Sequence, residues 1–242
     1  MRFYNNNYIV EKTSDKVVEL SEGQKYMLDQ MDDDNFNIFC LNNVRQCGFT
    51  TLAVSICVDM LKRENEKHNI LYVSDKFSYI HDDFRMLIDY DKLECKKPEL
   101  GVYEYGNSML KVTSISSLEF IGFGKYDLVI FDNADFYGND WTKLQKAVEY
   151  CLNFGSGMRI IIASTPKNVR YKNDYSYFLD LCQGRNKNVK PITITPKYSF
   201  KRHEDIYNVL DPVSFDFEFN NAKFYFAYKE LFSRDRKKEK SK

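Results

Sequence analysis

The chain has 242 residues, and its 35 basic and 35 acidic side chains give a formal net charge of zero. This balance excludes a protein coated in positive charge for nucleic acid, so any DNA contact must come from a local patch. Apolar side chains make up 43% of the residues, enough for a substantial core. The six cysteines include no C-x-x-C pair, which favours a reduced, cytoplasmic protein. No apolar run is long enough for a membrane helix, so we expect no membrane partner.

Short apolar runs alternate with helical patterns along the chain. Strands are predicted at 36–41, 69–75, 126–135 and 158–166, with an edge strand at 192–200. Helices are predicted at 50–67, 78–91, 141–154 and 220–234. Continuous Ile, Val and Leu strands that alternate with helices predict an α/β fold, with a mainly parallel sheet covered on both faces. We expect one domain over residues 1–233, followed by a basic flexible tail at 234–242.

The loops that follow such strands meet at one edge of the sheet, where ligands bind. The loop "NNVRQCGFTT" (42–51) joins a strand to a helix, as does the phosphate-binding P-loop with its pattern G-x-x-x-x-G-K-[ST]. Gly48 and Thr50 keep the spacing of that pattern, but Phe49 stands at the position of the lysine. Backbone N–H groups at a helix start can bind anionic oxygens without a lysine. Taken alone, this loop fits an ordinary glycine-containing connection equally well.

The second loop follows "LVIFD", the Walker B pattern of four apolar residues before an aspartate. In P-loop ATPases this aspartate, here Asp132, holds magnesium, and the next residue is typically a glutamate that orients or deprotonates the attacking water. This chain has Asn133 at that position. An isolated Asp-Asn turn after a strand is common, but the order of P-loop, strand, Walker B, strand and "STP" is much less common by chance.

Four motifs in order resemble the ATPase domain of the large terminase subunit, the DNA-packaging motor of tailed phages. They are "LSEGQKYMLDQM" (20–31), "NVRQCGFTT", "YDLVIFDNADF" and "RIIIASTPKN". The resemblance covers roughly residues 18–185 and implies a P-loop NTPase-like fold with ATP and Mg²⁺ as ligands. A nuclease domain, which follows the ATPase domain in full-length large terminases, is expected to be absent, because the chain ends soon after the ATPase region.

The resemblance also assigns roles to individual residues. It implies nucleotide-binding positions at Gln24, which would recognise adenine, and at Arg45, Gln46, Gly48, Phe49, Thr50 and Thr51. It implies magnesium ligands at Thr50 and Asp132, a degenerate catalytic-base position at Asn133, and a coupling motif at Ser164, Thr165 and Asn168.

The two departures from the family pattern predict impaired ATP hydrolysis. Losing one preorganised electrostatic donor, as at Phe49, costs about 10²–10³ in rate. Losing a general base, as at Asn133, costs roughly 10²–10⁴. We therefore expect weak or lost binding of ATP and Mg²⁺, and a pseudo-ATPase that acts as a binding or regulatory subunit. Its expected partner is an active terminase subunit or the portal, in the cytoplasm of an infected cell.

Two other interpretations stay open from the sequence. The protein could be an active terminase-type ATPase, with Arg45 or a neighbouring subunit supplying charge and Asp135 serving as the base. It could also be a helicase-like P-loop module that binds nucleic acid, although helicases place S-A-T where this chain has "STP". Six of the residues in 234–242 are basic, so this tail either contacts double-stranded DNA or merely solubilises the chain.

Overall fold

The structure is a computed structural model. It describes residues 4, 8–11, 16–44, 47–63, 65–119, 125–137, 140–154, 157–165 and 177–195. Three candidate site residues, Arg45, Gln46 and Asn168, lie outside the described residues, as do the predicted helix at 220–234 and the basic tail at 234–242. No helix in the described ranges is long and apolar enough to cross a membrane.

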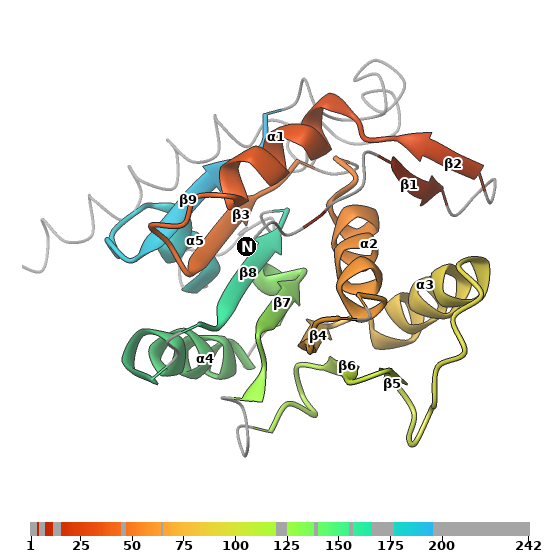
Figure 1. The fold of residues 1–242 in the computed structure, drawn as a ribbon. Coiled ribbons are helices and arrows are strands. Elements are labelled where there is room, and N and C mark those ends of the chain that lie inside the picture. Colours follow the sequence, from red (N-terminus) through yellow and green to blue (C-terminus); the bar gives the residue numbers. More distant parts are fainter. Residues whose placement is uncertain are drawn as a thin grey trace, which may run out of the picture.

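A seven-stranded sheet forms the centre of the molecule (Figure 1). Its strands run in the order β5-β6-β4-β7-β8-β3-β9, and every pair is parallel except β5 with β6. Their bounds are β3 (Ile38–Asn42), β4 (Asn69–Ser74), β5 (Val102–Tyr105), β6 (Ser108–Ser114), β7 (Leu128–Asp132), β8 (Arg159–Ser164) and β9 (Val189–Thr193). This arrangement confirms the predicted α/β fold with a mainly parallel sheet.

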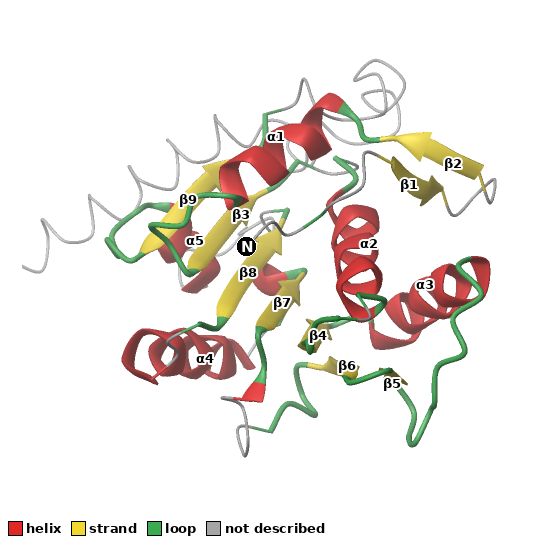
Figure 2. Cartoon of the chain, viewed as in Figure 1, coloured by secondary structure: helices red, strands yellow, loops and turns green. Residues whose placement is uncertain are grey.

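Helices cover both faces of the sheet, as Figure 2 shows. The helices are α1 (Glu22–Met31), α2 (Phe49–Leu61), α3 (Phe77–Tyr90), α4 (Trp141–Phe154), α5 (Tyr177–Cys182) and the short 3₁₀ turn η2 (Ala134–Phe136). Alternate residues of one strand enter different cores, because side chains in a strand point to opposite faces. Phe39 and Leu41 join the cluster with α1, α2 and α3, whereas Ile38 and Cys40 join the cluster with α4 and α5.

Two small hairpins were not among the predicted elements. One is the pair β1 (Tyr8–Glu11) and β2 (Lys16–Glu19), which forms a separate two-stranded sheet packed against α2. The other is β5 with β6, which closes one edge of the main sheet. At the opposite edge, β9 corresponds to the predicted edge strand but begins and ends earlier in the sequence.

Candidate nucleotide-binding site

The carboxyl ends of four parallel strands lie side by side at one edge of the sheet. In the strand register, Asn42 pairs with Ser164, Asp132 pairs with Ala163, and Ser74 pairs with Asp132. The loop after β3, the Walker B aspartate and the start of the "STP" motif therefore meet at this edge. Parallel α/β sheets bind ligands at the same place, beyond the carboxyl ends of their strands.

The loop after β3 turns sharply into α2 at Gly48. This glycine is the N-cap residue of α2 and has φ 80° and ψ 17°, the left-handed conformation that favours glycine. The next three residues, Phe49, Thr50 and Thr51, form the first turn of α2. The first N–H groups of a helix have no partner within the helix and, together with the helix dipole, attract anions. The start of α2 thus has the backbone form of a phosphate-binding loop.

Phe49, at the position of the P-loop lysine, lies in the hydrophobic core. Its side chain is only 4% exposed and belongs to the cluster formed by α1, α2, α3 and the sheet. The family's lysine places a positive charge on phosphates, whereas this phenylalanine anchors the first turn of α2 by burying apolar surface. Among the described residues, the charge that the lysine would bring to the site is thus replaced by packing.

Thr50 and Asp132 lie within hydrogen-bond distance of each other. The Thr50 hydroxyl donates to Asp132 Oδ2 over 3.0 Å, and the hydroxyl of Tyr72, on β4, donates to the same oxygen over 2.9 Å. The backbone N–H of Asn133 donates to the other carboxylate oxygen over 2.9 Å. Burial raises the pKa of Asp132 to about 6, although the hydrogen bonds from Tyr72 and Thr50 act in the opposite direction.

This oxygen pair fits a magnesium ion. Mg²⁺ prefers hard oxygen ligands and commonly takes one or two of them from the protein, the rest coming from water and substrate phosphates. Within the described residues, no group of three His, Cys, Asp or Glu side chains could hold a metal ion by itself. Thr50 and Asp132 would therefore hold the ion together with the phosphates of a nucleotide, whose charge the ion would neutralise.

Asn133, at the predicted catalytic-base position, has a backbone conformation that suits asparagine. Its backbone has φ 57° and ψ 38°, in the left-handed region, where asparagine is several-fold enriched among residues other than glycine. Its side chain acts to lower the pKa of the carboxylate of Asp75, which follows β4. A carboxylate only accepts hydrogen bonds, and the amide group of Asn133 is a donor of the kind that it requires.

Asp75 is a site residue that the sequence patterns did not single out. It follows Ser74, whose side chain also acts to lower the pKa of the Asp75 carboxylate. Partial burial raises the pKa of Asp75, and its charge contributes to the raised pKa of Asp132. The clue in the sequence was the acidic end of "NILYVSD": this strand ends at the same edge as Walker B, so its last residues belong to the site.

Tyr137 joins the ends of β4 and β7. Its hydroxyl lies 3.0 Å from the carbonyl oxygen of Val73 and 2.9 Å from that of Asp132, and its single hydrogen is shared between the two. The ring is buried and stacks edge-on near Phe131, with 6.3 Å between ring centroids. Tyr137 therefore fixes the relative position of the two strand ends that carry Asp75 and Asp132.

Gln24, predicted to recognise adenine, connects α1 to the P-loop. The residue is fully buried, and its Nε2 donates to the carbonyl oxygen of Gly48 over 3.1 Å. Its Oε1 accepts from the backbone N–H of Ser21 over 2.9 Å, while Ser21 caps the start of α1 in return. Gln24 thus lies at the candidate site, and its role toward adenine stays a prediction.

The described part of the coupling motif contacts the P-loop. The backbone N–H of Asn43 donates to the carbonyl oxygen of Ser164 over 2.8 Å, and the Ser164 hydroxyl donates to the carbonyl oxygen of Thr165 over 3.0 Å. Ser164 is buried, whereas Thr165 is half-buried. A displacement of the loop after β3 would therefore also displace the residues after β8, and the reverse.

Asp135, considered as an alternative base, lies on the side of the sheet covered by α5. It is buried in η2, and its charge contributes to raising the pKa of Cys182 in α5. Thr50 belongs to α2, which packs on the other face. Asp135 therefore lies apart from Thr50, whereas the charge of Asp75 acts on the pKa of Asp132.

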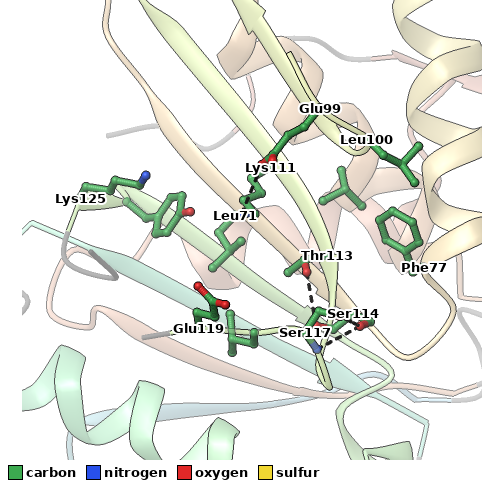
Figure 3. A pocket seen from close by; sticks show the side chains of 13 residues that line it. Leu71, Phe77, Glu99, Leu100, Lys111, Thr113, Ser114, Ser117, Glu119 and Lys125 are labelled. Carbon is green, nitrogen blue, oxygen red and sulfur yellow. Dashed lines mark hydrogen bonds and ion pairs between the residues drawn. The ribbon is translucent and has the colours of Figure 1, made fainter. Parts of the chain in front are cut away.

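A hollow of about 590 Å³ lies elsewhere, beside β6 and the start of α3 (Figure 3). Its wall mixes apolar side chains such as Phe77 and Leu100 with charged ones, and Lys111 forms an ion pair with Glu99 over 3.6 Å. None of the candidate nucleotide-binding residues lines this hollow. The candidate site therefore rests on the strand ends and not on this hollow.

Comparison with solved structures shows which known fold the chain has. No family model matches the chain, and no curated protein matches it. The large terminase of bacteriophage HK97 matches with a TM-score of 0.62 and 14% identity, over 80% of this chain and 43% of that one. The chain has the fold of a large terminase ATPase domain.

Two further terminase structures support this fold. The large terminase ATPase domain of Thermus phage P74-26 matches with a TM-score of 0.57 and 14% identity, over 84% of this chain and 93% of that domain. The large terminase of another thermophilic bacteriophage, solved in complex with ATP-gamma-S, matches with a TM-score of 0.58 and 10% identity, over 82% of this chain. The chain spans 43% of the HK97 protein and 51% of the terminase solved with ATP-gamma-S.

Proposed function

We propose that this protein is a terminase-type DNA-packaging protein that binds a magnesium nucleotide weakly and hydrolyses it slowly. The observation that carries the proposal is the 3.0 Å hydrogen bond between Thr50 and Asp132. These residues come from two separate motifs, 82 residues apart, and they are the hydroxyl and the carboxylate that a Mg²⁺–phosphate complex requires. One terminase with the same fold, from a thermophilic bacteriophage, was solved with ATP-gamma-S.

Weak binding follows from the residue at position 49. With Phe49 in the core, the phosphates would be held by the N–H groups at the start of α2 and by the ion at Thr50 and Asp132. Helix N-termini attract anions without a lysine, but the loss of a full positive charge weakens the attraction. We expect a dissociation constant in the millimolar range, roughly −4 kcal/mol.

Slow hydrolysis follows from the residue at position 133. Asn133 cannot accept a proton from water, and the loss of a general base costs roughly 10²–10⁴ in rate. Such a rate is too slow for a motor that must package DNA quickly. We therefore propose a binding or regulatory role, in which the domain docks on an active terminase subunit or on the portal.

A titration of the purified protein with ATP tests the proposal. Ligand-observed ³¹P NMR measures millimolar binding directly, with and without Mg²⁺. We expect binding that depends on Mg²⁺ and that weakens at least about tenfold in Thr50→Val and Asp132→Ala, since each removes one magnesium ligand. Thr142→Val, an exposed substitution on α4, is the matched control and should bind like the wild type. Submicromolar binding, or binding unchanged in both site variants, would contradict the proposal.

DNA contact is proposed for the basic segment 234–242. Six basic and two acidic residues there give a local positive excess in a chain of zero net charge. Neutralising phosphates in this way gives weak, sequence-independent binding that falls steeply with salt. Deleting 234–242 should remove most binding to duplex DNA at low salt and leave the melting temperature nearly unchanged. Equal DNA binding by the truncated protein would place the contact on the body of the domain instead.

A further inference from the structure

Asp75 and Asn133 form a pair at the ends of two neighbouring strands. Ser74, the last residue of β4, pairs in register with Asp132, the last residue of β7. Asp75 is therefore the first residue after β4, and Asn133 is the first residue after β7. Neighbouring strands lie about 4.8 Å apart. The side chains of Ser74 and Asn133 both act to lower the pKa of the Asp75 carboxylate, and Asp75 is exposed to solvent.

The position of this pair relative to the candidate magnesium ligands is fixed by buried contacts. The Tyr137 hydroxyl bridges the carbonyl oxygens of Val73 and Asp132, each of them within two residues of the pair. Tyr72, on the same strand as Ser74, donates to the oxygen of Asp132 that also accepts from Thr50. The end of β4 therefore already contributes to the site, and Asp75 extends from that end.

We propose that Asp75, at the end of β4 beside Asn133, positions the water that attacks the nucleotide, in place of the carboxylate absent at position 133. This inference rests on the proposed function, because it requires a magnesium nucleotide at Thr50 and Asp132. In the reaction, the water oxygen bonds to the γ-phosphorus while the bond from that phosphorus to the bridging oxygen breaks. The bridging oxygen keeps the electron pair and leaves with ADP, and both water hydrogens leave with the phosphate. The Asp75 carboxylate accepts a hydrogen bond from the water and so orients its lone pair.

This arrangement explains why asparagine suits position 133. A glutamate there would bring a third negative charge beside Asp75 and Asp132, and like charges at a shared site repel each other. The amide of Asn133 instead adds no charge beside Asp75 and acts to lower the pKa of its carboxylate. Asparagine also tolerates the left-handed backbone at this position better than glutamate does.

Phosphate release at saturating ATP and Mg²⁺ tests the role of Asp75. We expect slow turnover by the wild type that exceeds the background of Asp132→Ala, and a fall of about 100-fold, or to that background, in Asp75→Asn. The dissociation constant of the nucleotide should stay within about twofold of the wild type. Asp82→Asn, an exposed aspartate on α3, is the matched control and should keep the wild-type rate.

A second variant separates positioning from folding. Asn133→Gly removes the amide donor but keeps a residue that accepts the left-handed backbone, so it should lower turnover about tenfold with little change in melting temperature. Asp75→Glu should recover part of the rate lost in Asp75→Asn, because it restores the carboxylate.

Three outcomes would overturn the inference. They are wild-type turnover equal to that of Asp132→Ala, wild-type rates in a folded Asp75→Asn, and wild-type rates in Asn133→Gly. Magnesium-dependent nucleotide binding that persists in such a case would leave the proposed function standing, so the two ideas fail separately.

Discussion

At position 49 the chain has a phenylalanine that packs in the core, where the family pattern has a lysine that binds phosphate. Phe49 is 4% exposed and belongs to the core beneath α2, where an ammonium group would be removed from water and surrounded by apolar side chains. Burying an unpaired charge is far more costly than burying an aromatic ring. A single Phe49→Lys substitution therefore recreates the P-loop lysine only if the first turn of α2 also rearranges.

The substitution Phe49→Lys is expected to lower the free energy of unfolding by about 3 kcal/mol or more, because it removes a buried ring and adds a charge. Phe49→Leu, which keeps an apolar side chain, should cost less than about 2 kcal/mol. Urea denaturation followed by circular dichroism measures both changes. If Phe49→Lys unfolds at the same urea concentration as the wild type, the side chain at 49 does not support the core as described.

The buried carboxylate of Asp132 predicts a pH dependence of stability. Its pKa rises from 3.8 to about 6 in the folded protein. Between these two pH values the folded state binds more protons than the unfolded state. The contribution of Asp132 to the free energy of unfolding is therefore fully present below pH 4 and is lost as the pH rises through 6. A difference of about two pKa units corresponds to roughly 3 kcal/mol.

Asp132→Asn removes this titration. In magnesium-free buffer, the melting temperature of Asp132→Asn minus that of the wild type should increase by roughly 5–10 °C between pH 4 and pH 7. Replacing Oδ2, which accepts from Thr50 and Tyr72, by an amide group shifts the difference by a constant that does not depend on pH. Calorimetric scans at several pH values measure it, and a difference that stays flat with pH would show that Asp132 is not held in a raised-pKa environment.

Helix α1 is connected to the turn at Gly48 by a side-chain hydrogen bond. The Gln24 amide joins Ser21 at the start of α1 to the Gly48 carbonyl before α2, so one buried side chain connects two residues, Gln24 and Gly48, that are 24 positions apart. A ligand that moves the turn at Gly48 would therefore also displace α1 or strain this hydrogen bond.

Replacing Gln24 with methionine should lower the free energy of unfolding by about 1–3 kcal/mol, because it leaves the Ser21 N–H and the Gly48 carbonyl without this buried partner. Lys25→Met, on the exposed side of the same helix, is the control and should change stability by no more than about 0.5 kcal/mol. Chemical denaturation of both variants checks the expectation. Equal stability of the two would mean that the tether contributes nothing.

The strands differ in how well the sequence predicted them. Central strands such as β3, β7 and β8 are buried on both faces and read as continuous apolar runs, so their positions could be predicted. The strands β1, β2 and β5 have four residues each, too few to show a clear period. Their pairing depends on contacts with α2 and β6 that no local pattern reveals.

The same limit applies to the site residues. The meeting of the loop at Thr50 with Asp132 followed from topology, because parallel strands present their carboxyl ends at one edge. The contacts of Tyr72, Asp75 and Tyr137 depend on the register between β4 and β7, which the sequence does not specify. Phe49 was recognised as a departure from the P-loop pattern, but its burial in the core became visible only in the folded chain.

Over the whole molecule, the chain has the fold of a terminase ATPase domain, but two positions of the family's motifs, 49 and 133, have other residues. The chain matches terminase structures over about 80% of its length at 14% identity or less. The sheet order and the meeting of Thr50 with Asp132 belong to the backbone framework, whereas positions 49 and 133 carry other side chains. We propose that this framework still binds a nucleotide at the carboxyl ends of its strands and hydrolyses it slowly.

Backbone-amide NMR with titrated magnesium nucleotide tests this account most directly, because it locates the ligand on the chain. We predict chemical-shift changes that saturate in the millimolar range, are largest for the N–H groups of Gly48, Phe49, Thr50 and Thr51, and extend to Asn133 and Asp75. The same titration of Asp132→Ala should show these changes strongly reduced. Shifts confined to other surfaces, or no shifts at the start of α2 at any attainable concentration, would contradict a nucleotide-binding edge in this protein.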